Sequence, residues 1–404
     1  MDASTPQAKR FAETLAKWRS VPMSLMAVGG LLSVVGLFTN AKQFGYSYLL
    51  AFIFFLSLCL GGLFLVIIHH LFDAHWSVPI RRVAEHFAFL LPVMAALFIP
   101  IALLAPTIYG WMSVPDPMSD PTIAAKQPLF TKGWFYILAL MLFALWTFLS
   151  YRLRYWSIRQ DETGAADCTR AMRRLAAWGI FAFALSLTLG AIMWVKSLEW
   201  QWFSTMYGVY YFAASVWTTL ATIYVVTLVL QRSGPLTQVM HHNHFKDLGT
   251  LLLAFTVFYA YIHFSQYFLI WNAAIPEETF WYVKREQGSW WQIGMILIFG
   301  HFFLPFLALL RIDAKLSLPL MLPLCAWAWL MHFCDMSFNI MPVIHPDGFH
   351  LHYLDLASFA FIGGVLSTVF LKYFKGNAPY PVKDPRLGES LGVPQIGSEF
   401  KTAK

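Results

Sequence analysis

The sequence predicts an all-α protein that crosses a membrane about ten times. Of its 404 residues, 58% are hydrophobic and only 12% are charged, whereas about a quarter of the residues in a typical soluble domain are charged. The mean hydropathy of +0.58 comes from apolar runs spread along the whole chain, each long enough to cross a bilayer as a helix. These runs are continuously apolar rather than alternating, which excludes strands as the main element.

The apolar runs give ten predicted spans, in order from the N-terminus. They cover about residues 22–40, 46–70, 79–108, 130–152, 172–194, 205–231, 248–272, 290–310, 317–335 and 355–373. Residues 1–21 are too polar for the apolar core of a signal peptide, so we expect the first span to be retained. Residues 374–404, rich in Pro, Gly and Lys, are expected to form a tail.

The basic residues predict the orientation of these spans. With ten spans, the loops and termini on the N-terminal side hold 22 of the 28 Lys and Arg residues, and the opposite loops hold 6. The positive-inside rule therefore places both termini in the cytoplasm. The formal charge of +7 follows from the same loops, so nucleic acid is not an expected partner. The four cysteines include no CxxC pair, and the sequence signals no metal or iron–sulfur site on this chain.

Ionisable residues at membrane depth are costly and mark candidate functional sites. The densest group joins the second and third spans and comprises His69, His70, Asp73, Arg82, Glu85 and His86. Spacings of three and four residues place His69 with Asp73, and Arg82 with Glu85 and His86, on common helix faces. Two interpretations stay open: a structural ion pair between Arg82 and Glu85, or a proton-conducting or quinone-facing role.

A second group is expected towards the outside. His263 lies 16 residues after Asp247, about 24 Å along a helix, and His332 and Asp335 are three residues apart near the end of the ninth span. Asp247 opens the seventh span, where a carboxylate favours the helix N-terminus. These residues complete the set of proton-path candidates. The inner and the outer groups could each form half of a path across the membrane. His301 stands apart, and a hydrogen-bonded core histidine is an equally good interpretation of it.

Several stretches resemble the ActF membrane subunits of bacterial alternative complex III, quinol:electron acceptor oxidoreductases of NrfD/PsrC type. Residues 247–282 carry the FSQYFLIW, PEE and WY patterns. Residues 61–85, residues 301–306, and Asp335 followed by Met-Pro-Val at 341–343 agree with the same family. The resemblance covers most of the chain.

The resemblance implies how the spans pack and in which kind of complex the chain works. The middle eight spans would form two four-helix bundles, about 46–194 and 205–335, with two peripheral helices. The chain would serve assembly and proton translocation or quinone access in a quinol:cytochrome c (or other acceptor) oxidoreductase of the bacterial cytoplasmic membrane. Its partners would be a homologous NrfD-like membrane subunit, an iron–sulfur subunit and multihaem cytochrome c subunits, which hold the cofactors. Quinol is a possible ligand, although no residue can be assigned to it.

Two other functions remain alternatives. A secondary transporter would place broken helices near the membrane midplane in matching repeats. A cytochrome b-type subunit would hold haem between two histidines from facing spans, but the histidines show no paired spacing at matched depths. We therefore expect no cofactor on this chain.

Overall fold

The computed structural model describes residues 18–392, which are helical and contain no strand. Within this range, nine helices are each long and apolar enough to cross a membrane, and a bent pair of helices makes a tenth span. The predicted fold class, an all-α polytopic membrane protein with about ten spans, is confirmed. Residues 1–17 and 393–404, the outer parts of the two predicted terminal segments, lie outside the described residues.

The helices follow one another in a simple order along the chain. The first half contains α2 (Ser20–Thr39), α3 (Ala41–Phe72), α4 (Val78–Ala88), α5 (Leu91–Leu97), α6 (Ile99–Ile108), η1 (Gly110–Ser113), α7 (Pro121–Ala124), α8 (Lys132–Thr163), α9 (Ala166–Trp194) and η2 (Lys196–Glu199). The second half contains α10 (Tyr207–Arg232), α11 (His242–Ala273), α12 (Pro276–Arg285), α13 (Trp290–Ile296), the π-helix η3 (Leu297–Phe303), α14 (Leu304–Leu309), α15 (Ile312–Leu316), α16 (Leu318–Ile340), η4 (Met341–Val343), α17 (Tyr353–Lys375) and α18 (Leu387–Ser390).

The third span is bent rather than straight. Its two parts, Val78–Leu97 and Ile99–Ile108, meet at an angle of 55°. Pro92 and Pro100 stand in the first turns of α5 and α6, where each lacks the N–H that would continue the preceding helix. Two prolines within one apolar run therefore break a span that hydropathy alone predicts as continuous.

Helix α8 extends well beyond its predicted end at residue 152. It continues to Thr163 and stops at Gly164, whose φ of +68° is the left-handed conformation that glycine adopts readily. The added turns are polar, so hydropathy does not detect them. They carry Arg154 and Asp161 into the site described below.

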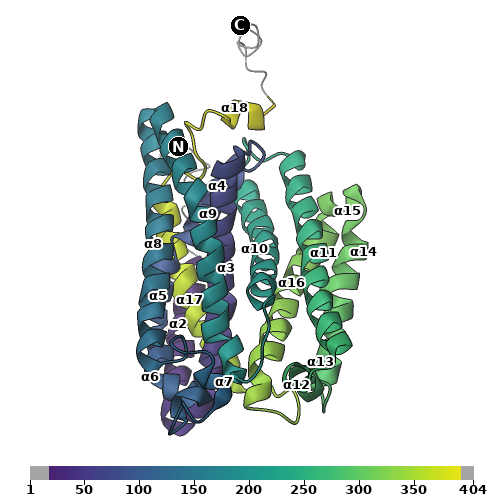
Figure 1. The fold of residues 1–404 in the computed structure, drawn as a ribbon. Helices are drawn as coiled ribbons and strands as arrows, with labels where there is room; N and C mark the ends of the chain where they lie inside the picture. The colour runs from purple at the N-terminus through teal and green to yellow at the C-terminus, as the bar shows by residue number, and fades with distance from the viewer. Residues whose placement is uncertain (1–17, 393–404) are drawn as a thin grey trace, which may run out of the picture.

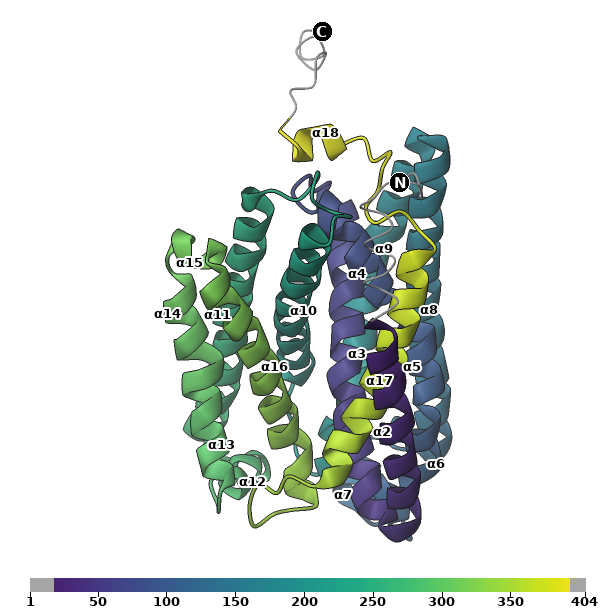
Figure 2. The ribbon, with the colours of Figure 1, turned by 180° about the vertical axis from the view of Figure 1, so that it is seen from behind.

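The spans form two groups with an extra helix pair (Figure 1). Helix α3 is the central element. Of its apolar 18-residue stretch, 89% is buried inside the protein, and it packs against α10. We call α3, α4–α6, α8 and α9 the first bundle, and α10, α11, α13–α14 and α16 the second bundle. Helices α2 and α17 cross each other against α3 (Figure 2).

Small residues allow α2 and α17 to approach closely. A Cβ atom on Gly29 would lie 2.5 Å from the backbone nitrogen of Phe361, and one on Gly364 would lie 2.7 Å from the carbonyl oxygen of Pro22. Glycines permit this backbone contact between membrane helices. Because the two helices run antiparallel, α2 begins and α17 ends at the same end of the molecule, which we call the inner end. The chain then crosses this end as α18 and its flanks, residues 380–392, which we call the strap (Figure 1).

Candidate functional site

The inner end of the first bundle holds a buried carboxylate between two arginines. Glu85 on α4 has one oxygen 2.7 Å from Arg82 Nη1 and the other 3.2 Å from Arg81 Nε, and all three side chains are about 1% exposed. The spacings of three and four residues place these groups on one face of α4. The predicted Arg82–Glu85 pair is present, and Arg81 is a third member that was not among the residues predicted from the sequence.

Side chains from α8 and from the strap complete the charge balance of this site, which we call the inner cluster. Arg82 also pairs with Asp161 of α8, and Arg81 pairs with Asp384 of the strap. Arg154 of α8 donates a hydrogen bond of 2.9 Å to His86 Nδ1. The cluster thus contains three guanidinium groups and three carboxylates. Buried charges are tolerated when they are paired and hydrogen-bonded in this way.

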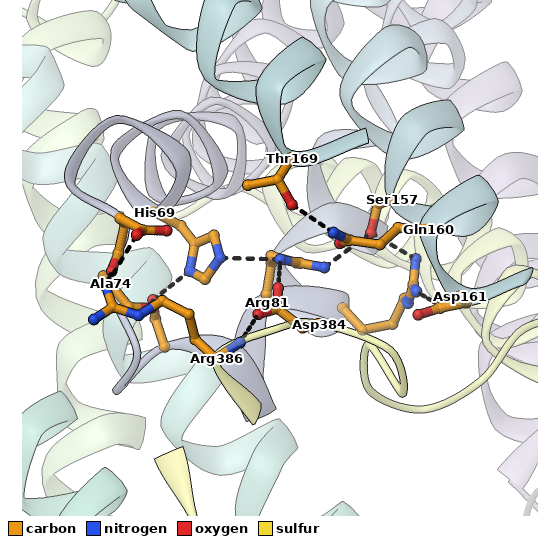
Figure 3. Close-up of polar contacts among 12 residues, drawn as sticks. His69, Ala74, Arg81, Ser157, Gln160, Asp161, Thr169, Asp384 and Arg386 are labelled. Atoms are coloured by element: carbon orange, nitrogen blue, oxygen red, sulfur yellow. Dashed lines mark hydrogen bonds and ion pairs between the residues drawn. The ribbon is translucent and has the colours of Figure 1, made fainter. Parts of the chain in front are cut away.

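Hydrogen-bond geometry shows which ring nitrogen of the neighbouring His69 accepts a hydrogen bond. Arg81 Nη1 lies 3.0 Å from His69 Nε2, and because a guanidinium can only donate, Nε2 accepts. The other ring nitrogen, Nδ1, lies 2.7 Å from Ser77 Oγ. Figure 3 shows the Arg81 side chain directed at both His69 and Asp384. His70 packs edge-on against His69, and its Nε2 has no hydrogen-bond partner in the described part of the chain.

The strap covers the inner cluster from the inner end. Asp384 reaches Arg81, and Arg386 contacts both the carbonyl and the carboxylate of Asp73. The backbone N–H of Val382 donates to Asp161 Oδ1 at 3.0 Å. The described part of the predicted tail is therefore folded against the chain's own ion pairs.

Asp73 closes α3, four residues after His69. It caps the helix in the left-handed conformation, with φ of +52°, and its N–H donates to the carbonyl of His69. Its half-exposed carboxylate pairs with Arg173 and Arg386. No route from Asp73 through His69 to Glu85 is present among these contacts.

A chemically different network lies in the second bundle, near the outer ends of α10, α11 and α16. Asp335, fully buried, accepts a hydrogen bond from Tyr210. Its second oxygen, Oδ2, has no hydrogen-bond partner among residues 18–392. No Lys or Arg of the described chain forms an ion pair with it. We call Asp335 and the side chains linked to it the outer network.

Hydrogen bonds extend this network along α11. Tyr210 donates its proton to Asp335, so the contact of 3.3 Å between Tyr210 and Tyr259 has Tyr259 as its donor. Tyr259 in turn lies 3.3 Å from His263 Nδ1, which must then donate. The three side chains therefore form a directed chain of donors that ends on Asp335.

His301 belongs beside this chain and not apart from it. Its ring is stacked between Trp217 and Tyr259, with centroid distances of 3.9 and 3.7 Å. The ring is fully buried, and neither nitrogen has a hydrogen-bond partner within the described range. Of the interpretations that the sequence left open, a hydrogen-bonded core histidine is not supported by these side-chain contacts. His301 lies in the π-helix η3, an irregularity that is common at functional sites.

His332 and Asp335 turn to different partners although they are only three residues apart. Ser57 of α3 donates to the carbonyl of Phe54 at 2.6 Å, so it accepts from His332 Nε2, 2.8 Å away. His332 Nδ1 has no partner in residues 18–392. His332 thus links α16 to the first bundle, whereas Asp335 links α16 to α10.

Polar groups connect Asp335 with the outer end of the molecule. Asn339 donates to Tyr210 at 3.0 Å, and its backbone carbonyl accepts from Arg285 Nη2 at 3.1 Å. Arg285 also binds Glu199, 2.8 Å away, which binds Lys284 at 3.0 Å. Burial would raise the pKa of Glu199, but Arg285 and Lys284 together hold it below its ordinary value.

Asp247 lies far from the outer network. Helix α11 begins at His242, so Asp247 stands in its second turn and not at the N-terminus that hydropathy indicated. Its partly exposed carboxylate is 3.9 Å from Lys246. The 16 residues between Asp247 and His263 keep them about 24 Å apart along the helix.

The inner cluster and the outer network are separate. His69 and Ser57 are 12 residues apart on α3, about 18 Å by helical rise. The intervening side chains of α3 are apolar apart from Cys59. Thr219 of α10, which faces this stretch, donates to the carbonyl of Ser215 at 2.8 Å. The two halves are therefore not joined by a continuous row of side chains.

Within residues 18–392, no group of three or more His, Cys, Asp and Glu side chains is arranged to hold a metal ion. No protein-family model matches the sequence, and no curated protein matches it at a significant level.

Proposed function

We propose that this chain is an integral membrane subunit of a quinol-oxidising respiratory complex of the alternative complex III type, and that its outer network relays protons. One observation carries the proposal. The separate stretches that resemble the ActF family, residues 247–282, residues 301–306 and Asp335, come together in space at the outer network, where Tyr259, His301 and Asp335 meet.

The chemistry of the outer network suits proton transfer. Tyr and neutral His side chains can each donate and accept a hydrogen bond, so a proton that enters at one end of the row can leave at the other. The row from His263 through Tyr259 and Tyr210 points at Asp335. Asp335 Oδ2 has no hydrogen-bond partner in the described part of the chain and can accept a bond from water.

The inner cluster fits a role in assembly better than one in proton transfer. Each of its carboxylates is bound to an arginine, and the groups come from α4, α8 and the strap. The pairs hold three segments together at the inner end. Of the two interpretations that the sequence left open, a structural pair and a proton relay, we therefore propose the structural pair.

The first test is isolation of the chain from native membranes. Recovery together with multihaem and iron–sulfur subunits would support the proposal, whereas recovery alone would favour a transporter. Haem retained on this chain after denaturing separation, seen in an absorption spectrum, would favour a cytochrome b. A reporter fused after Lys404 should be active in the cytoplasm; periplasmic activity would reverse the orientation.

The relay is tested by Asp335→Asn in the assembled complex. This substitution preserves shape and removes titration, so assembly should be normal and the number of protons moved per electron should fall. Asp313→Asn, an exposed carboxylate on α15, is the matched control and should leave the ratio unchanged. An unchanged ratio in assembled Asp335→Asn complex would refute the relay.

A further inference from the structure

A large apolar groove opens between the helix pair α2–α17 and the second bundle. Its volume is about 1010 Å³, at the upper end of the ~300–1,000 Å³ range of pockets that enclose small-molecule ligands. Helices α10 and α16 form one wall, α2 and α17 form the other, and α3 supplies the floor with Phe55 and Cys59. Figure 2 shows these two helix pairs on either side of α3.

The groove lies in the inner half of the membrane domain. Its lining comes from the first turns of α2 and from the inner halves of α10, α16 and α17, and it reaches the middle of α3 at Phe55. Along α17 it extends from Gly363 to Leu371, eight residues or about 12 Å of helical rise. This length is close to the ~15 Å occupied by one leaflet, half of a hydrocarbon core of ~30 Å.

Two exposed cations stand at the inner rim of the groove. Trp18 and Leu371 line it, and Arg19 and Lys372 are their immediate neighbours in sequence. The contact of Gly364 with Pro22 sets the antiparallel register of α17 and α2. In this register Arg19 and Lys372 lie near the same end of the pair, about five residues or ~7.5 Å apart along the helix axis. Neither forms an ion pair with any residue of the described chain. Tryptophan and basic residues are typical of the bilayer interface.

We propose that this groove binds an anionic phospholipid of the inner leaflet, with its acyl chains between α17 and α16 and its phosphate at Arg19 and Lys372. Apolar walls of leaflet depth suit the chains. Two cations at the rim, which form no ion pair within residues 18–392, suit the headgroup, because basic pockets on the cytoplasmic side select anionic lipids. The lipid completes the contact between the helix pair and the second bundle.

The groove offers few free hydrogen-bonding groups to the ring of a quinone. The hydroxyl between its α10 and α16 walls, Thr222, already accepts a hydrogen bond of 2.8 Å from Trp329 and donates one of 2.7 Å to the carbonyl of Thr218. Apart from Ser367 the remaining lining is apolar or cysteine. The cations stand outside the groove, where they face the headgroup region.

The test is native mass spectrometry of the intact purified protein with added phosphatidylglycerol, phosphatidylcholine or menaquinone. Phosphatidylglycerol should be retained in preference to phosphatidylcholine. The double variant Arg19→Gln, Lys372→Gln should lower retained phosphatidylglycerol at least fivefold and abolish this preference. Arg174→Gln with Lys246→Gln, which removes two charges from the same side of the membrane away from the groove, should change neither.

A second variant tests the groove itself. Ala326 is exposed at the groove wall, so Ala326→Phe fills space without disturbing the core and should lower lipid retention. Ala184→Phe, at an exposed position on α9, is the control. Equal retention of both phospholipids, retention unaffected by Ala326→Phe, or preferential retention of menaquinone would each overturn the proposal.

Discussion

The inner cluster and the outer network both lie inside the protein, but they differ in whether their carboxylates have charged partners. The inner cluster balances three arginines against three carboxylates, whereas the outer network has one carboxylate, Asp335, bound only to neutral groups. A buried charge is stabilised by its counter-charges and is destabilising when one is removed. We therefore expect the first arrangement to hold helices in place, and the second to let its carboxylate exchange a proton with its neighbours.

Breaking the inner cluster should have the largest effect. Glu85→Gln leaves Arg81 and Arg82 with only Asp384 and Asp161 as carboxylate partners, and one buried positive charge becomes uncompensated. We expect a loss of about 3–5 kcal/mol in the free energy of unfolding, measured by thermal or denaturant unfolding in detergent, together with poor assembly.

Glu162→Gln is the control for this variant, because Glu162 is exposed on the same end of α8 and should unfold like the wild type. If Glu85→Gln assembles normally and loses only proton movement per electron, the inner cluster is a relay and the comparison above fails.

Releasing the strap should have a smaller effect. Asp384→Asn removes one of the two carboxylates at Arg81, while Glu85 stays in place. The expected loss is about 1–3 kcal/mol, the cost of leaving a buried charged group less well satisfied. Limited proteolysis should cut the chain near residues 376–392 faster than in the wild type. Asp347→Asn, exposed in an outer loop, should change neither stability nor cleavage, and unchanged cleavage of Asp384→Asn would mean that other contacts hold the strap.

Sequence reasoning succeeded where the physical cause is local. Hydropathy depends on about 20 consecutive residues, so all ten spans were found, and the Arg82–Glu85 pair follows from helical spacing. Arg81 carried the same signal, four residues before Glu85, and could have been named. Arg154 and Asp161 were missed because the polar end of α8 has no hydropathy signal, and Asp384 because it pairs with a residue 303 positions away.

The outer network also shows what could not be predicted from a single sequence. Spacing correctly put His332 and Asp335 on one helix, but it could not show that they face α3 and α10 respectively. His301 was judged isolated because its neighbours, Trp217 and Tyr259, come from two other helices. Which partner a buried polar group meets is decided by the packing of helices, and a single sequence does not contain that packing in readable form.

A moderate effect is expected in the outer network. Tyr210→Phe removes the hydroxyl that donates to Asp335, which keeps a contact of 3.4 Å from Asn339 Nδ2 at the same oxygen and its interaction with Tyr259. The free energy of unfolding should fall by about 1–3 kcal/mol, and proton movement per electron should fall with it. Tyr261→Phe, on the exposed face of α11, is the control. Normal proton movement in Tyr210→Phe would remove Tyr210 from the relay.

The last effect concerns an outer cation that has no carboxylate partner within residues 18–392, in contrast to the arginine–carboxylate pairs of the inner cluster. Lys196 is 8% exposed, and its ammonium lies 5.5 Å from the ring centroid of Phe203. Burial, and secondarily Lys126, lowers the pKa of Lys196 from 10.5 to about 7. Between about pH 7 and 10.5 the unfolded chain therefore binds more protons than the folded one, so stability rises with pH in this window.

Lys196 contributes at most about 1.4 kcal/mol per pH unit to the rise of the free energy of unfolding with pH. Lys196→Met should remove this contribution. Melting temperatures in detergent at pH 7 and pH 9 should differ clearly for the wild type and less for the variant. A residual difference should persist because burial also lowers the pKa of Lys126, to about 8. Lys132→Met, exposed at the start of α8, should behave as the wild type. If Lys196→Met keeps the full pH dependence, an anionic group balances Lys196 in the protein, and the contrast between a charge-paired inner end and an unpaired outer cation does not hold.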